Sequence, residues 1–191
     1  MPVDEIDRLL TQRRSVRAFR DTPIAEADLR AALEAAVWAP NHRRTEPWRF
    51  IVVRGDTQRQ LAARAGQLKQ TAHLRPESPE AVAVGERARA EMDNAAALLV
   101  VVQRVASDRF IAEEDYAACA LAADHALLAL WARGIAGRWN TGAITRDATA
   151  QRLLGVDANE RLVFLCPLGV PAEIPPRPAP QSAASRTTWL S

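Results

Sequence analysis

ALLVVVQ, residues 97–103, is a continuous apolar run that decides the fold class of this chain. It is too short for most helices, and a run without polar positions is typical of a strand that is covered on both faces. Two other segments have strand character: WRFIVVR at residues 48–54, which is rich in β-branched and aromatic side chains, and RLVFLCPLG at residues 161–169. The sequence therefore predicts a buried sheet.

Helical patterns lie around these strands. Apolar side chains at helical spacing predict a short first helix over about residues 3–10 and a second helix over residues 26–38. The second helix is expected to stop before Pro40, because the residue before a proline disfavours helical geometry. Further helices are expected over residues 57–70, 79–94 and 147–154. This order of elements, without an internal repeat, indicates an α+β sandwich.

A long helix is predicted over residues 110–133, where glycines follow. From Tyr116 to Trp131 it carries almost no charge except Asp124, and apolar side chains lie on every side. Such a helix is expected to be surrounded by protein all round. In a chain of 191 residues this pattern indicates a subunit interface.

Length and composition limit the classes of protein. The 191 residues have room for one domain, 1–191, and 48% of them are hydrophobic, which is enough to build a core. The 25 Lys and Arg residues against 23 Asp and Glu give a formal charge of +2, which makes duplex nucleic acid a poor partner. The proline-rich segment PAEIPPRPAP begins an extended carboxyl-terminal arm over about residues 171–191.

The cysteine and histidine positions indicate no metal site. Cys119 and Cys166 lie in a helical and a strand pattern and are interpreted as small buried hydrophobes. His42, His73 and His125 are scattered along the chain. The amino-terminal segment does not resemble a secretory signal, and no apolar run approaches the roughly 20 residues that span a bilayer. A cytoplasmic protein without membrane contact is therefore expected.

A cluster of basic side chains follows the first predicted helix in RRSVRAF, residues 13–19. In an extended conformation Arg13, Ser15 and Arg17 project to one side and Arg14 to the other, which groups two guanidinium groups with a hydroxyl. That group suits a phosphate monoester, whose charge is about −1.5 to −2 near neutral pH. The alternative is a solvated basic turn after a helix.

Two later segments also carry groups that bind ligands. APNHRRTEPWRF, residues 39–50, places hydrogen-bonding side chains, His42 among them, in a loop between a helix end and a strand. GRWNTGAI, residues 137–144, combines two glycines with side chains that stack or form hydrogen bonds, Trp139, Asn140 and Thr141. The alternatives are an exposed or structural His42 and an ordinary turn between helices.

Taken in order, these segments resemble the nitroreductase family, in particular its short single-domain members. The resemblance covers nearly the whole chain: the RRSVRAF start, the AP-NH-x3-EPWRF-x-VV block, the long apolar helix, the G-x-WNTGA turn and the L-x-PLGVP strand end. It implies an α/β/α sandwich with a mostly antiparallel central sheet, and a homodimer with a large interface around long central helices. Two FMN sites would then be built from both chains.

The resemblance also implies site residues. Arg13, Arg14 and Ser15 match residues that grip the FMN phosphate and ribityl chain. Trp38 and His42 match positions that reach the flavin of the partner subunit. A segment that lines the flavin is matched by Trp139, Asn140 and Thr141.

Three parts of the chain fit the family pattern less closely. Trp38 stands where many members have arginine, and Glu46 stands where many have an amide side chain. Because an ionised carboxylate cannot donate as an amide does, Glu46 is expected to pair with Arg43 or Arg44 instead. On the arm, candidates for further phosphate contacts are Arg177 and Arg186.

The implied activity is FMN-dependent transfer of reducing equivalents from NADH or NADPH to an organic acceptor, such as a nitroaromatic or a quinone, by a ping-pong mechanism. The cofactor carries the chemistry, so no catalytic side chain is assigned. No GxGxxG follows a strand, which disfavours a Rossmann nucleotide site. The alternatives are a non-catalytic flavin-binding protein, a specialised flavin enzyme (dehalogenase, dehydrogenase or flavin-cleaving enzyme) and a basic RNA-contacting protein.

Overall fold

The computed structural model describes residues 3–176 and 180–190 of the chain. Its α-helices are α1 (Val3–Gln12), α2 (Glu26–Ala36), α3 (Gly55–Thr71), α4 (Pro79–Asp93), α5 (Arg109–Trp131) and α6 (Ala148–Leu153). Its strands are β1 (Trp48–Val53), β2 (Ala97–Arg104), β3 (Ala136–Gly137) and β4 (Glu160–Gly169). Short 3-10 helices are η1 (His42–Arg44), η2 (Ala143–Arg146) and η3 (Ala183–Arg186).

The predicted helices and strands are confirmed with small changes at their ends. The second helix ends at Ala36, short of the predicted end at residue 38, because the chain tightens there: the N–H groups of Trp38 and Ala39 donate to carbonyls three residues back. Three helices begin at capping side chains: Ser78 accepts from a backbone N–H of α4, Asp108 from one of α5 and Asp147 from one of α6.

The strand β3 was not predicted. Its residues pair with the end of β4, Ala136 with Gly169 and Gly137 with Leu168. A Cβ atom at Gly137 would lie 2.7 Å from Cδ2 of Leu168 and 2.8 Å from Cδ2 of Leu127. The close approach at this glycine is therefore made by the protein core, and this part of the predicted turn belongs to the sheet.

The four strands form one antiparallel sheet in the order β1-β2-β4-β3. Val101 at its centre lies opposite Phe50 of β1 and Phe164 of β4. The register between β2 and β4 shifts after Val101, which marks an irregularity in the sheet. The expected α+β architecture with a mostly antiparallel sheet is confirmed.

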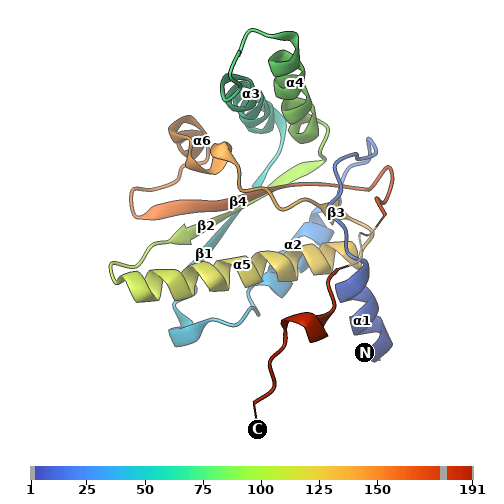
Figure 1. Cartoon of the computed structure of the whole chain (residues 1–191). Helices are drawn as coiled ribbons and strands as arrows, with labels where there is room; N and C mark the ends of the chain where they lie inside the picture. The colour runs from blue at the N-terminus through green and yellow to red at the C-terminus, as the bar shows by residue number, and fades with distance from the viewer. Residues whose placement is uncertain (1–2, 177–179, 191) are drawn as a thin grey trace.

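Helices on both faces of the sheet explain the apolar run at residues 97–103. Helices α3, α4 and α6 lie on one face, and α2 and α5 lie on the other (Figure 1). Along β2, Leu99 and Val101 belong to the cluster that includes α2 and α5. The residues that alternate with them, Leu98, Val100 and Val102, belong to the cluster that includes α3 and α6. Successive side chains thus enter two different apolar clusters.

Helix α5 packs on the sheet and on α2 through one face only (Figure 1). Small residues dominate the buried face, which comprises Asp115, Ala118, Cys119, Ala122, Ala123, Ala126, Leu127 and Leu130. Elsewhere on the helix Phe110, Tyr116 and Leu121 are 64%, 39% and 42% exposed. One chain therefore covers only part of a helix that was predicted to be surrounded by protein.

Candidate functional site

The amino-terminal basic segment and the loop after β3 meet beside the sheet. Ser15 forms an isolated parallel bridge with Gly137, and Phe19 forms an antiparallel bridge with Pro171. Gly169 gives the Phe19 ring its space, since a Cβ atom there would lie 2.5 Å from Cγ of Phe19. These contacts hold the segment along the edge of the sheet that β3 forms. Two of the three segments that the sequence singled out are thus neighbours in space.

The basic segment carries hydrogen-bond donors that lack acceptors. Nη1 of Arg14 donates to the carbonyls of Thr11 (2.9 Å) and Arg13 (2.8 Å), but its Nε is buried without an acceptor among the described residues. Buried donors are rarely left unsatisfied in proteins, so Nε of Arg14 fits an anion that is supplied from outside the chain. Next to it, Arg13 is partly buried and Ser15 is exposed, and their side chains form no hydrogen bond to another described residue.

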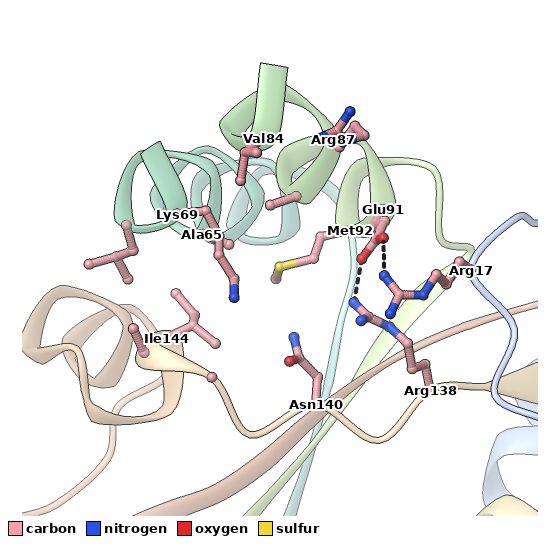
Figure 2. Close-up of a pocket in the computed structure, with 14 residues that line it drawn as sticks. Arg17, Ala65, Lys69, Val84, Arg87, Glu91, Met92, Arg138, Asn140 and Ile144 are labelled. Carbon is pink, nitrogen blue, oxygen red and sulfur yellow. Dashed lines mark hydrogen bonds and ion pairs between the residues drawn. The ribbon is translucent and has the colours of Figure 1, made fainter. Parts of the chain in front are cut away.

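A cavity of about 340 Å³ lies between α3, α4 and the loop after β3. Its apolar lining comprises Ala65, Leu68, Val84, Ala88, Met92, Ala143 and Ile144. Figure 2 shows Lys69 of α3 and Asn140 of the loop pointing into this space from opposite sides. Neither side chain has a hydrogen-bond or ionic partner among the described residues. The cavity is thus an apolar space with two unengaged polar groups.

One wall of the cavity is an ion-pair network through Glu91 of α4. Its Oε1 accepts from Nη1 of Arg17 at 2.8 Å, and its Oε2 accepts from Nη2 of Arg138 (Figure 2). The Arg138 side chain is 17% exposed; burial lowers the pKa of its guanidinium group, and the charge of Glu91 opposes that shift. Glu91 thereby fixes two cations and ties α4 to both neighbouring segments.

The loop after β3 directs its three predicted site residues to different places. The Trp139 ring packs on Phe164 with ring centroids 4.1 Å apart and is partly exposed. Asn140 enters the cavity, whereas Thr141 lines a separate hollow of about 480 Å³ beside η2 and β4. Of these three residues, the structure places only Asn140 at the cavity.

A comparison with known protein families shows which family this chain belongs to. A sequence profile described as the Nitroreductase family matches residues 10–170. This chain belongs to the nitroreductase family. The match runs from α1 to the end of β4 and includes both segments that border the cavity.

Individual relatives cover most of the chain as well. A Bacillus subtilis protein named as a candidate NAD(P)H nitroreductase, YfhC, is 31% identical over 172 residues, which cover 87% of this chain and 84% of that protein. A nitroreductase-like family protein from Bacillus cereus superposes with a TM-score of 0.82 at 24% identity, covering 97% and 95% of the two chains. A candidate nitroreductase from Desulfovibrio desulfuricans, solved in complex with FMN, gives a TM-score of 0.72 at 25% identity and covers 97% and 96%. The predicted family and fold are confirmed.

Two predicted site residues of this nitroreductase family member lie away from the cavity. Trp38 is 83% exposed, and Nδ1 of His42 lies 2.8 Å from Oε1 of Glu114. Glu114 lies 13 residues before Leu127, which packs against Gly137, so about 20 Å of helix α5 separates the two places. One chain does not bring His42 to the cavity. Its predicted contact with a flavin therefore requires a partner subunit.

The loop before β1 has a strained backbone. Arg43, Arg44 and Glu46 have φ angles of 66°, 50° and 45°, a region that costs energy for residues with a side chain. Oδ1 of Asn41 accepts from the Glu46 N–H at 2.7 Å, which helps to hold this conformation. Arg43 forms an ion pair with Glu114, and the structure does not form the expected pairing of Glu46 with Arg43 or Arg44. Strain of this kind is often found at functional loops of proteins.

The carboxyl-terminal arm adds no contact to the cavity within the described residues. Arg177 lies outside the described residues, and Nε of Arg186 donates to Oε1 of Gln181 at 2.8 Å. Residues 3–176 and 180–190 contain no group of three or more His, Cys, Asp or Glu side chains that could hold a metal ion. In the same ranges no helix is both long enough and apolar enough to cross a membrane.

Sequence reasoning missed three residues that shape the cavity: Lys69, Glu91 and Arg138. Lys69 carried a signal, because it is the only lysine in the sequence. Glu91 and Arg138 carried none, because their pairing depends on how α4 crosses the loop. Arg17 was grouped with Arg13 by alternation along an extended segment, and the structure turns it to Glu91.

Proposed function

We propose that this chain is one subunit of a homodimeric FMN-dependent oxidoreductase. It passes reducing equivalents from NADH or NADPH to a small organic acceptor such as a nitroaromatic or a quinone. Family membership and the FMN bound to the Desulfovibrio desulfuricans relative support the class of activity. The observation that carries the assignment in this chain is the buried, unsatisfied Nε of Arg14, in a basic segment whose Arg17 lines the cavity.

Each segment of the site has a role in this proposal. Arg13, Arg14 and Ser15 hold the phosphate, because charge-assisted hydrogen bonds from guanidinium groups are the strong ones. Asn140 is the loop side chain available to hydrogen-bond the flavin ring. Arg17 and Arg138, oriented by Glu91, place positive charge at the cavity wall, which stabilises negative charge that develops there on reduction.

The chemistry belongs to the cofactor, and the chain supplies the space. FMN, held by these residues, would supply the two-electron chemistry between the nicotinamide and the acceptor. With a quinone the reaction balances as NAD(P)H, one proton and quinone giving NAD(P)⁺ and hydroquinone. In this proposal the acceptor takes the place of the nicotinamide over the same flavin face, which is a ping-pong mechanism.

A second copy of the chain completes the site. Apolar side chains remain uncovered on α1, on α5 and on the arm, including Val3, Leu10, Phe110, Leu121, Ile174, Trp189 and Leu190. Large exposed apolar surface marks an interaction site. A symmetric dimer that packs two α5 helices together covers these residues and lets the partner's His42 and the partner's Trp38 approach the flavin.

The visible spectrum of the purified protein tests the proposal. We expect the absorption of oxidised flavin, bleached by NADH or NADPH without oxygen and restored by a quinone. Initial rates at several acceptor concentrations should give parallel double-reciprocal lines, and light scattering should give the mass of a dimer. A colourless monomer that takes up no added FMN would overturn the proposal.

The substitution Arg13→Ala tests whether the amino-terminal segment binds the FMN phosphate. Loss of one charge-assisted hydrogen bond should raise the dissociation constant for FMN at least about tenfold. Quenching of free FMN fluorescence during titration of the apoprotein measures this constant. Arg75→Ala is the matched control, because Arg75 lies exposed at the tip of the α3–α4 pair and its side chain has no described partner. An unchanged constant in Arg13→Ala would remove Arg13 from the site.

A further inference from the structure

We propose that Asp115 of α5 is a positioning residue for the flavin site of the partner subunit. Through Thr45 it holds the loop of residues 41–46 in the conformation that presents His42 across the dimer interface. The inference rests on the proposed function, because the proposed dimer is what brings this loop to a flavin.

Asp115 is a carboxylate inside the protein that binds the loop directly. The residue is 3% exposed, and its Oδ1 accepts from Oγ1 of Thr45 at 2.5 Å. A buried carboxylate is costly unless hydrogen bonds compensate for the water that it has lost. Thr45 and Asp115 are 70 positions apart in the sequence, so this hydrogen bond fixes where the loop lies on α5.

The hydrogen bonds that start at Asp115 run through the loop in one direction. An ionised carboxylate only accepts, so Thr45 uses its single hydroxyl proton on Asp115 and accepts from other groups. Nδ2 of Asn41 donates to Oγ1 of Thr45 at 3.0 Å. Because the amide nitrogen is engaged there, Oδ1 of Asn41 is free to accept from the Glu46 N–H, which it does at 2.7 Å. The carboxylate thus determines which way the Asn41 amide faces.

The loop conformation that these hydrogen bonds hold is a costly one. Arg43, Arg44 and Glu46 have positive φ angles, between 45° and 66°, which residues with a side chain rarely adopt. Such a backbone persists only where its surroundings hold it in place. When the hydrogen bonds that begin at Asp115 are lost, the loop should relax and its side chains should move.

Glu114, the neighbour of Asp115 on α5, holds side chains of the same loop. Its Oε1 lies 2.8 Å from Nδ1 of His42, and its Oε2 lies 3.6 Å from Nε of Arg43. With Nδ1 engaged, Nε2 is the nitrogen of the His42 ring that would make the predicted flavin contact. The two acids have separate tasks: Glu114 orients the ring, and Asp115 sets the backbone that carries it.

The substitution Thr45→Val tests the role of the hydroxyl, because valine keeps the shape of threonine. Loss of a hydrogen bond to a charged group should raise the dissociation constant for FMN about tenfold, while light scattering still gives a dimer. Thr45→Ser keeps the hydroxyl, so its constant should stay within about twofold of wild type. Asp115→Asn should also weaken FMN binding. Its matched control is Glu113→Gln, which removes a largely exposed carboxylate from the same helix and should leave the constant unchanged.

Mixed dimers separate an effect on the partner's site from damage within one chain. One chain carries Thr45→Val, the other carries Arg13→Ala, and two affinity tags isolate the mixed species. If the loop acts across the interface, both losses fall on one site, and the dimer should bind one FMN with the wild-type dissociation constant. If the loop acts within its own chain, each site has one loss and neither binds FMN with that constant. The second result would overturn the inference.

Hydrogen exchange of the apoprotein needs no flavin. The Glu46 N–H, which Asn41 protects, should exchange about tenfold faster in Thr45→Val and at the wild-type rate in Thr45→Ser. Unchanged exchange in Thr45→Val would show that Asp115 does not hold the loop.

Failure of this inference differs from failure of the proposed function. A wild-type protein that binds FMN, together with a Thr45→Val variant that binds it equally well, would overturn the inference alone. A wild-type protein that takes up no FMN would overturn the proposed function and the flavin-related role of Asp115 with it.

Discussion

Both cysteines lie inside the apolar cluster on the α2–α5 face of the sheet. Cys119 on α5 and Cys166 on β4 are fully buried and unpaired. The sequence predicted both as small buried hydrophobes from the patterns around them, and this prediction is confirmed. Burial raises the pKa of each thiol to about 12, so neither forms the reactive thiolate near neutral pH.

The native protein should therefore be inert to thiol reagents. At mildly alkaline pH we expect no reaction of Cys119 or Cys166 with a disulfide reagent that releases a coloured thiolate, and both should react after denaturation. The absorbance of the released thiolate, followed with native and with denatured protein, measures how many cysteines react in each state. Rapid labelling of the folded protein would show that the α2–α5 face opens in solution.

A second prediction at this scale concerns Glu91. In Glu91→Gln the largely buried Arg138 loses its counter-charge and lies close to Arg17, another cation. We expect the free energy of unfolding to fall by about 1–2 kcal/mol, between the value of an exposed and a buried pair. Urea titration measures it. Glu113→Gln is the control, because its pair with Arg109 is largely exposed and should contribute nothing measurable.

At the scale of elements, apolar patterning found the three long strands and the helices, because burial on one or two faces leaves a period in the sequence. It could not find β3, whose two residues are too few to carry a period. Nor could it show that α3 and α4 touch backbone to backbone. A Cβ atom at Gly66 would lie 2.8 Å from the Gly85 oxygen, and one at Gly85 would lie 2.9 Å from the Gly66 oxygen. Contacts between residues distant in sequence leave no local signal.

The glycine contact between α3 and α4 should be intolerant of side chains. Gly85→Ala inserts a methyl group where backbone atoms already meet, so we expect a loss of stability of about 1–3 kcal/mol and faster amide exchange in both helices. Hydrogen exchange with mass spectrometry measures the exchange. Gly142→Ala is the comparison, since its nearest neighbour would lie at an ordinary 3.7 Å. Equal behaviour of the two variants would contradict the close crossing.

The start of α6 should give the protein part of its acid sensitivity. Asp147 caps α6 through the Ala150 N–H at 2.9 Å and accepts from Nε and Nη2 of Arg64 at 3.0 and 2.6 Å. The hydrogen bonds from Arg64 hold the pKa of Asp147 below its usual value. The stability from this pair is therefore complete above the ordinary pKa of about 3.9 and is lost as pH falls through the lower native pKa.

Two variants of Asp147 separate the ion pair from the cap. Asp147→Asn keeps a capping side chain and removes the charge, so its deficit against wild type should shrink as pH falls below about 4. Asp147→Ala also loses the cap and should be less stable than Asp147→Asn by about 1 kcal/mol at every pH. Urea titrations across this pH range measure both. A deficit of Asp147→Asn that does not change with pH would contradict the ion-pair account.

At the scale of the whole molecule, the site could be predicted only in part. The sequence singled out Arg13–Ser15 and the loop with Asn140 as candidates, because basic and turn residues cluster locally, and the structure brings the two segments together. Their contacts with a flavin stay predictions. Sequence reasoning gave no account of Lys69, whose orientation depends on the crossing of α3 and α4. Trp38 and His42 stay predictions, since their proposed contact is made across an interface that one chain does not contain.

The proposed dimer predicts the effect of a charge on the outer face of α5. In Leu121→Glu a carboxylate replaces a side chain that is 42% exposed in one chain, and burying it between two helices is costly. We expect a monomer by light scattering that also binds FMN more weakly. Leu74→Glu is the control, because Leu74 at the tip of the α3–α4 pair is 99% exposed and far from α5 in the fold (Figure 1). An unaltered dimer would contradict the assignment of this face.

The two bridges of the amino-terminal segment have a consequence for biosynthesis. Phe19 and its partner Pro171 are 152 positions apart, so the segment leaves the ribosome long before the residues that hold it. At roughly 5–20 residues per second that delay lasts about 8–30 s. Throughout this delay the nascent chain lacks the contacts that position the segment, so, if the segment binds the FMN phosphate as proposed, flavin binding follows the synthesis of β4.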